Sequence, residues 1–301
     1  MFVVNIKENK DQEPQFIEIF NSSQSCFAKI DLQLGGSLQE LRLDGKSLIS
    51  SDHVLPYQES YASAILFPFV NRIEQGRYSF DGINHELYIN EKGQNNALHG
   101  LVYNKTFKLE YEDIKSTSAS VCMSYIEKNR IKGFPFSYKI SLTYRLTNST
   151  LELQVDVENT DEKAFPFSLG WHPYFNTSNL FHSYLSFKSH KKLVVNESMI
   201  PTAEESIIIE DPIQIKDKSF DDCFVLKTNK VKLETPDYAM ELSSSSEENY
   251  LQLYTPNNRK SIAIEPQTAP ANSFNNTIGL KVLKPKAKHS LSWNIKLINN
   301  E

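Results

Sequence analysis

The segment from residue 138 to residue 159 constrains the fold more than any other part of the chain. In YKISLTYRLTNSTLELQVDVEN, apolar residues alternate with polar ones from Tyr138 to Leu146, and the alternation resumes from Leu151 to Val157 after the turn sequence TNST. Successive side chains of a strand point to opposite faces, so this alternation places the apolar side chains on one face. The segment therefore predicts an antiparallel hairpin with one buried face.

Other segments repeat the period of two. SLSWNIKLI places Leu291, Trp293, Ile295 and Leu297 on one face, and KSIAIEP and YLQLYTP are shorter examples. Turn sequences such as LDGK and FDGINH recur between the predicted strands. Helical periodicity is nearly absent, because Gly, Pro or Asn interrupts every candidate stretch. These features predict an all-β chain that folds as a large antiparallel β-sandwich.

The chain shows no internal repeat and no linker rich in Pro, Ser or Gly. We therefore expect residues 1–301 to form a single domain. The 32 basic and 37 acidic residues give a net charge of −5, without the long basic run that would follow nucleic acid phosphates or an anionic membrane. Nucleic acid and membrane are thus not expected as partners.

Cysteine usage and the N-terminal sequence bear on the compartment. Cys26, Cys122 and Cys223 lie about a hundred residues apart, which provides neither a disulfide framework nor a Cys-x-x-Cys zinc pair. The N-terminal apolar patch is too short for a signal peptide core, and no apolar run reaches 18 residues. These features favour a reducing, cytoplasmic location.

Several common catalytic motifs are missing from the sequence. It contains no Gly-rich phosphate loop, no His-Glu-x-x-His and no Gly-x-Ser-x-Gly. Phosphoryl transfer, zinc proteolysis and serine hydrolysis therefore lose most of their support. The seven histidines are scattered, so their spacing predicts no metal site.

Two segments in the first third of the chain combine a polar group with apolar neighbours. Arg72 follows an apolar stretch in FPFVNRIEQG, and its guanidinium offers a fixed fork of donors that suits vicinal hydroxyls. A charge on the rim of a sheet would give the same pattern. His99 precedes a glycine in NNALHG, and that position alone is more typical of a turn histidine than of a site residue.

The segment SLGWHPYF places a histidine, His172, among aromatic residues. Histidine changes its protonation state near neutral pH, which suits a proton donor. The nearby rings could form stacking faces for a pyranose, and the candidates are Phe167, Trp171, Tyr174 and Phe175. The same rings could equally hold a core histidine, so the residues alone leave both readings open.

Two further segments supply carboxylates. SIAIEPQTAP ends an alternating strand with Glu265, where apolar neighbours could tune its pKa for base work, although an exposed edge charge fits equally well. In SFDDCFVL, Asp221 and Asp222 would point to opposite faces of an extended segment, so only one can face a given pocket. Together with the histidines and the arginine, these groups form an inventory suited to binding sugar hydroxyls and moving protons.

The order of these segments resembles the aldose 1-epimerase (galactose mutarotase) family. The run NRIEQGRYSFDGINHELYINEKGQNNALHG resembles the Asn-Arg-Ile, Asp-Gly and Leu-His-Gly run of that family, and GWHPYF, FDDCF and EPQTAP follow in the same order. The resemblance covers nearly the whole chain, from GGSLQEL onward. It implies a galactose mutarotase-like supersandwich that holds a hexose in an open cleft and acts without metal or other cofactor.

The resemblance also implies roles for individual residues. Glu265 matches the general base that acts on the anomeric hydroxyl, and His172 matches the acid that protonates the ring oxygen. The remaining matches, which hold the sugar hydroxyls, are His99, Arg72, Asp221, Asn71 and Gln267. The expected activity is an isomerase reaction that interconverts the α and β anomers of a monosaccharide.

Other functions are compatible with the same residues. A hexose-6-phosphate 1-epimerase would need extra cations beside the cleft, for which Lys105 and Arg77 are candidates. A glycoside hydrolase would use Glu265 and Asp221 as its carboxylate pair. A sugar-binding or sensing protein would keep the cleft without turnover. The protein is expected to be a monomer or a homodimer.

Overall fold

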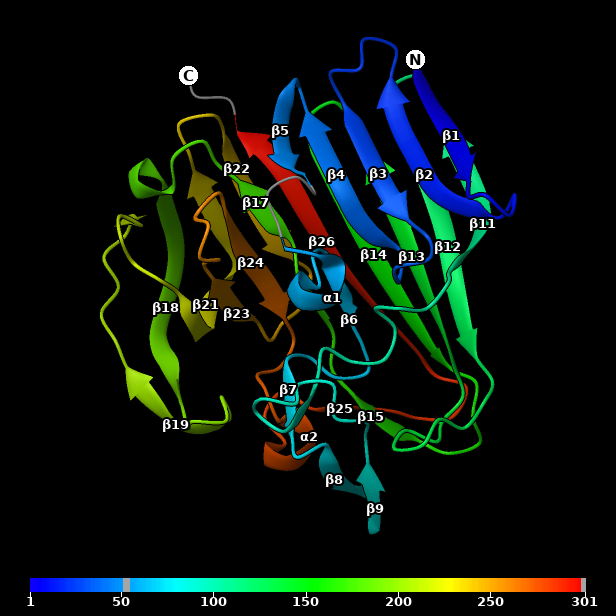
Figure 1. Ribbon diagram of the computed structural model, residues 1–301, viewed down its shortest axis with the longest axis vertical. Coiled ribbons are helices and arrows are strands. Elements are labelled where there is room, and N and C mark those ends of the chain that lie inside the picture. The colour runs from blue at the N-terminus through cyan, green and yellow to red at the C-terminus, as the bar shows by residue number, and fades with distance from the viewer. Residues whose placement is uncertain (51–54, 299–301) are drawn as a thin grey trace.

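The predicted hairpin is present in the computed structural model, which describes residues 1–50 and 55–298 (Figure 1). Strand β13 (Tyr138–Leu146) pairs antiparallel with β14 (Thr150–Asn159), with Ile140 opposite Val157. Buried residues alternate with partly exposed ones along both strands. The apolar face of the hairpin is therefore the buried face, as the alternation predicts.

The hairpin belongs to an antiparallel sheet of 15 strands. The main path of this sheet runs in the order β11 (Lys108–Ile114), β12 (Ala119–Glu127), β13, β14, β26 (Lys288–Ile298), β22 (Ala239–Ser244), β21 (Asp221–Glu234), β23 (Tyr250–Tyr254), β24 (Ser261–Gln267), β16 (Gly170–Trp171) and β6 (Ile65–Leu66). Four more strands pair beside this path, and these are β17 (Tyr174–Asn176), β18 (Tyr184–Val195), β19 (Pro201–Ser206) and β20 (Ile213–Gln214).

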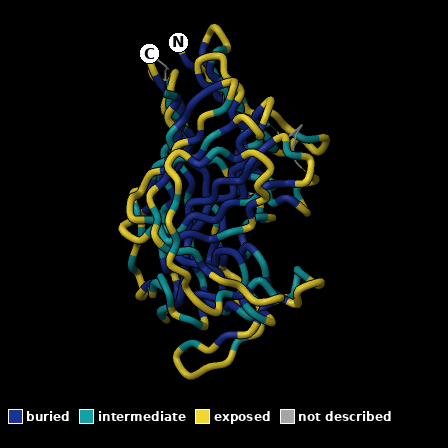
Figure 2. The backbone as a smooth tube through the Cα atoms, turned by 90° about the vertical axis from the view of Figure 1, so that its left-hand side faces the viewer, coloured by how far each residue is buried: buried dark blue, intermediate teal, exposed yellow. Residues whose placement is uncertain are grey.

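A second sheet of five strands lies in front of the β11 to β14 half of the large sheet in Figure 1. Its strands are β1 (Phe2–Glu8), β2 (Pro14–Asn21), β3 (Phe27–Asp31), β4 (Ser37–Leu43) and β5 (Lys46–Ile49). Buried apolar residues of both sheets form one continuous core, which Figure 2 shows as a dark band between exposed loops. The predicted all-β sandwich is therefore confirmed.

Short elements complete the structure at the lower end in Figure 1 and around the loops. The small sheets pair β7 (Arg72–Glu74) with β10 (Asn96–Leu98), β8 (Arg77–Phe80) with β9 (Ile83–Glu86), and β15 (Phe165–Phe167) with β25 (Lys281–Leu283). The helical turns are α1 (Tyr57–Ser60), α2 (Ser273–Asn276) and the 3₁₀ turn η2 (Leu180–His182). In the described part of the chain, no helix has the length and apolar character needed to span a membrane.

Candidate active site

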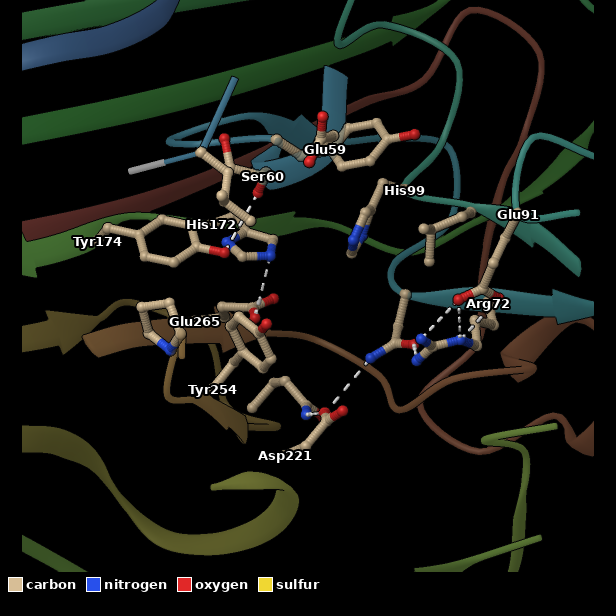
Figure 3. A pocket seen from close by; sticks show the side chains of 16 residues that line it. Glu59, Ser60, Arg72, Glu91, His99, His172, Tyr174, Asp221, Tyr254 and Glu265 are labelled. Atoms are coloured by element: carbon tan, nitrogen blue, oxygen red, sulfur yellow. Dashed lines mark hydrogen bonds and ion pairs between the residues drawn. The ribbon is translucent and has the colours of Figure 1, made fainter. Parts of the chain in front are cut away.

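A cavity of about 300 Å³ brings together most of the predicted residues (Figure 3). Six predicted side chains line it, and these are Asn71, Arg72, His99, His172, Asp221 and Glu265. They come from β7, β21 and β24, from the loop before β7 and from the loops after β10 and β16, so segments far apart in sequence meet at one place. A volume of this size suits a small-molecule ligand.

His172 and Glu265 face each other in one wall of the cavity. Every residue of β24 is buried, and β24 carries Glu265 with only 2% of its side chain exposed. His172 follows β16, where its backbone N–H donates to the carbonyl oxygen of Ala64. The distance from His172 Nε2 to Glu265 Oε1 is 3.3 Å. The interpretation of Glu265 as an exposed edge charge is therefore wrong, because this carboxyl group is buried beside the imidazole of His172.

Burial drives both members of this pair toward their uncharged forms. Removal of solvent raises the pKa of Glu265 well above its ordinary value, and the nearby Asp221 carboxylate adds to that effect. Burial also lowers the pKa of His172 to about 4. Burial therefore disfavours both the ionised carboxylate of Glu265 and the protonated imidazole of His172.

Tyr174 and Gln267 support this pair from either side. The Tyr174 ring stacks on His172 at 5.1 Å between centroids and 17° between planes. Gln267 does not line the cavity, and instead its Nε2 donates to Glu265 Oε2 at 3.0 Å. Gln267 therefore orients the carboxyl group without reaching the space where a ligand would lie.

His99 lies beside His172 because of an unusual backbone at β10. His99 has a φ of +62°, and its N–H donates to the carbonyl oxygen of Asn71. Its ring meets the His172 ring edge to face at 5.1 Å. Burial, reinforced by His172 and Arg72, lowers the pKa of His99 well below its ordinary value. His99 is thus a neutral hydrogen-bonding group.

Gly100 makes this turn sterically possible. It has a φ of +77°, and a Cβ at this position would lie 2.3 Å from the carbonyl oxygen of Phe67. Only glycine combines this backbone conformation with such a close approach of two backbone segments. The Leu-His-Gly motif therefore places His99 through a local geometric requirement.

Arg72 and Glu91 form the opposite side of the cavity from His172 (Figure 3). Arg72 Nε donates to both carboxylate oxygens of Glu91 at 3.1 and 2.9 Å, and Arg72 Nη2 donates to Oε1 at 2.7 Å. Arg72 Nη1 also donates to Asn71 Oδ1 at 3.1 Å. No motif in the sequence marked Glu91 as a site residue, although it lies in the same segment, NEKGQNNALHG, as His99.

Asp221 faces the cavity and Asp222 faces away from it. Gln252 Nε2 donates to Asp221 Oδ1 at 2.9 Å, whereas Asp222 pairs with Lys192 at 2.5 Å and lines only an adjoining cavity. This division agrees with the expectation for an extended segment. Asp221 remains accessible to solvent at one side, yet desolvation by its neighbours raises its pKa despite the opposing effect of Arg72.

The structure corrects the predicted aromatic walls. Among the four rings proposed from the sequence, Tyr174 alone lines the cavity, while Phe167, Trp171 and Phe175 are buried in the core. Trp171 packs against Trp293 at 6.2 Å. Alternation along the chain explains the outcome, because side chains on either side of His172 in sequence point to the opposite face. The other rings of the cavity belong to Tyr61 and Tyr254, which no sequence motif indicated.

The two cations considered for a phosphate lie outside the cavity lining. Arg77 forms an exposed pair with Glu86, and Lys105 lies over the ring of Tyr125. Among the described residues, no three His, Cys, Asp or Glu side chains are grouped so that they could hold a metal ion. The described lining of the cavity consists of hydrogen-bonding, titratable and apolar side chains.

Comparison with known proteins agrees with this arrangement. The sequence model of the aldose 1-epimerase family matches residues 22–296. The chain belongs to the aldose 1-epimerase family. Among curated proteins, it is 25% identical to the uncharacterized protein YihR of Escherichia coli K12 over 274 residues, which cover 87% of each chain. It is also 25% identical to the galactose mutarotase of Sus scrofa over 236 residues, which cover 69% of this chain and 67% of that protein.

Solved structures show that this aldose 1-epimerase family member shares a known fold. A galactose mutarotase-like protein from Clostridium acetobutylicum matches with a TM-score of 0.86 and 22% identity, covering 100% of this chain and 99% of that chain. Galactose 1-epimerase from Lactobacillus acidophilus matches with a TM-score of 0.81 and 19% identity, covering 100% and 99%. The fold of this chain is therefore the galactose mutarotase-like sandwich.

Proposed function

We propose that this protein is a mutarotase that interconverts the α and β anomers of a hexose. The observation that carries the proposal is the 3.3 Å contact between His172 Nε2 and Glu265 Oε1 in the wall of a small cavity. Anomer exchange needs one proton removed from O1 and one delivered to O5. A histidine and a carboxylate that share one proton supply both transfers.

The proposed reaction begins with the sugar in the cavity and its anomeric centre at this pair. The reaction starts from the form of the pair in which the shared proton has moved from Glu265 to His172. Glu265 then accepts the proton of O1 while His172 gives its proton to O5, and the C1–O5 bond breaks to leave an open-chain aldehyde. Rotation about the C1–C2 bond presents the other face of the aldehyde. Attack of O5 on C1 returns one proton to His172 and the other from Glu265 to O1, so the enzyme ends in its starting state.

The remaining lining groups support the same proposal. Arg72, His99 and Asp221 would bind ring hydroxyls, and Asn71 would contribute through its contacts with Arg72 and Gln252. Asp221 and neutral His99 can accept hydrogen bonds, while Arg72 donates them. General acid and base groups placed in this way each contribute about 10² to 10⁴ in rate.

Polarimetry tests the proposal directly. Fresh α-glucose and α-galactose are dissolved with and without the protein, and the approach to the equilibrium rotation is followed. The proposal predicts faster equilibration in proportion to protein concentration, with the final rotation unchanged. Detectable sugar binding without faster equilibration would instead indicate a sensing or binding protein and would refute the catalytic proposal.

A further inference from the structure

The charges that line the cavity are strongly unequal in the described part of the chain. Four acidic side chains line it, Glu59, Glu91, Asp221 and Glu265, against one residue with a permanent positive charge, Arg72. Burial drives Glu265 toward its uncharged form and Glu91 pairs with Arg72, so the carboxyl groups of Glu59 and Asp221 are the ones left to repel an anion. An unpaired Arg72 could compensate the negative charge of an anionic ligand.

Glu91 occupies the two donor positions of Arg72 that suit an anion best. The Nε and Nη2 groups of a guanidinium form the fork that binds a carboxylate or a phosphate with two parallel hydrogen bonds. Glu91 takes that fork at 2.7 to 3.1 Å, with only 15% of the Arg72 side chain and 17% of the Glu91 side chain exposed. Glu91 is held in turn by Asn96 Nδ2 at 3.0 Å.

Arg72 keeps donors for neutral groups despite this pairing. A guanidinium has five N–H groups. Two are directed to Glu91 and one Nη1 group to Asn71, so the remaining N–H groups can meet sugar hydroxyls. In the adjoining cavity of about 200 Å³, Lys192 is likewise occupied by Asp222 at 2.5 Å. Both cavities thus present cations that are already neutralised by a neighbouring carboxylate.

We propose that Glu91 determines substrate charge selectivity: by holding Arg72 in a bidentate pair, it makes the cavity select uncharged aldoses and reject sugar phosphates and uronic acids. This inference rests on the proposed mutarotase function. Among the described residues that line the cavity, an anionic substituent would meet Asp221 and Glu59 without an unpaired Arg or Lys to compensate, and like charges at such short range disfavour binding. A neutral hydroxyl carries no such penalty.

The test measures anomer exchange by NMR for glucose, galactose, glucose 6-phosphate and glucuronate. The wild-type protein should show kcat/KM values for both anionic sugars at least about tenfold below those for the neutral sugars, as expected for one uncompensated charge within the cavity. This difference should shrink as ionic strength rises, because salt screens charge repulsion. These measurements need no variant.

Glu91→Gln keeps the size of the side chain and removes its charge. We expect the ratio of anionic to neutral kcat/KM to rise about tenfold or more, through better turnover of the anionic sugars. Glu86→Gln is the matched control, since Glu86 pairs with Arg77 at 3.8 Å on the surface, with 58% and 69% of these side chains exposed. The control should leave the ratio unchanged.

The possible outcomes distinguish failure of the role of Glu91 from failure of the proposed mutarotase function. If Glu91→Gln lowers turnover of neutral and anionic sugars equally, Glu91 has only a structural role and the inference is wrong. Wild-type protein that turns over glucose 6-phosphate as well as glucose would also overturn it, while leaving the mutarotase proposal intact. If the wild-type protein accelerates no sugar at all, the proposed function itself fails, and the inference with it.

Discussion

Replacing Glu265 by glutamine separates the chemistry of the proposed base from its packing. Glutamine has the same length, and its side-chain oxygen can still accept the hydrogen bond from Gln267 Nε2, now 3.0 Å from Glu265 Oε2. Its amide cannot accept a proton from O1. The new N–H group would also donate to His172 Nε2 across the present 3.3 Å contact, which would hold the imidazole in its neutral form.

The expected loss follows from these two changes. Removal of a positioned general base costs about 10² to 10⁴ in rate, equivalent to about 3 to 5 kcal/mol of transition-state stabilisation. Because Glu265→Gln disables the acid as well as the base, we expect kcat to fall by about 10³ or more. The fall should appear in kcat rather than in KM, since the hydroxyl-binding groups stay in place.

Although Glu265→Gln should lose activity, we expect its thermal stability to rise. The pKa of Glu265 is raised in the folded state, so above the ordinary carboxyl pKa the unfolded chain releases this proton more readily than the folded protein does. The free energy of unfolding therefore falls as the pH rises through this range. Glutamine avoids that fall. We expect the midpoint of thermal unfolding of Glu265→Gln at pH 7 to 8 to exceed that of the wild type by about 2 °C or more.

The assay combines polarimetry with thermal unfolding followed by circular dichroism. Glu127→Gln serves as the control, since Glu127 is another buried glutamate, with 3% of the residue exposed, and lies on β12 outside the cavity lining. The control should keep its activity. A folded Glu265→Gln protein that retains more than about a tenth of wild-type kcat would refute the role of Glu265 as the base.

Three further predictions follow from the same geometry. The rate should form a broad plateau against pH, since a second proton enters the His172 and Glu265 pair only near pH 4 and the shared proton leaves only above the raised pKa of Glu265; a single inflection near 6.5 in kcat would contradict the shared proton. Arg72→Lys should raise KM about tenfold with a smaller change in kcat, because a lysine cannot reproduce the fork held by Glu91; an unchanged KM would exclude Arg72 from binding. Gly100→Ala should lower the free energy of unfolding by about 2 kcal/mol or more, because its Cβ would lie 2.3 Å from the Phe67 carbonyl oxygen; denaturant titration at wild-type stability would show that the turn can relax.

Much of the fold follows from local patterns in the sequence. Alternation from Tyr138 to Leu146 and from Leu291 to Leu297 predicts strands and their buried faces, because the side-chain period of a strand is two wherever it occurs. The same rule separates Asp221 from Asp222. Strand order does not follow from such patterns. The last strand, β26, lies between β14 and β22, and these two strands are far apart in sequence from each other and from β26.

The candidate site divides in the same way. The motifs of the chain indicate which chemical groups are available, and their order marks His172, Glu265 and Arg72 as members of one site. The contact between His172 and Glu265, the burial of Trp171 in the core and the pairing of Glu91 with Arg72 depend on the folded arrangement. These contacts join segments that are distant in sequence, and their charges and pKa values depend on burial, which no local pattern specifies.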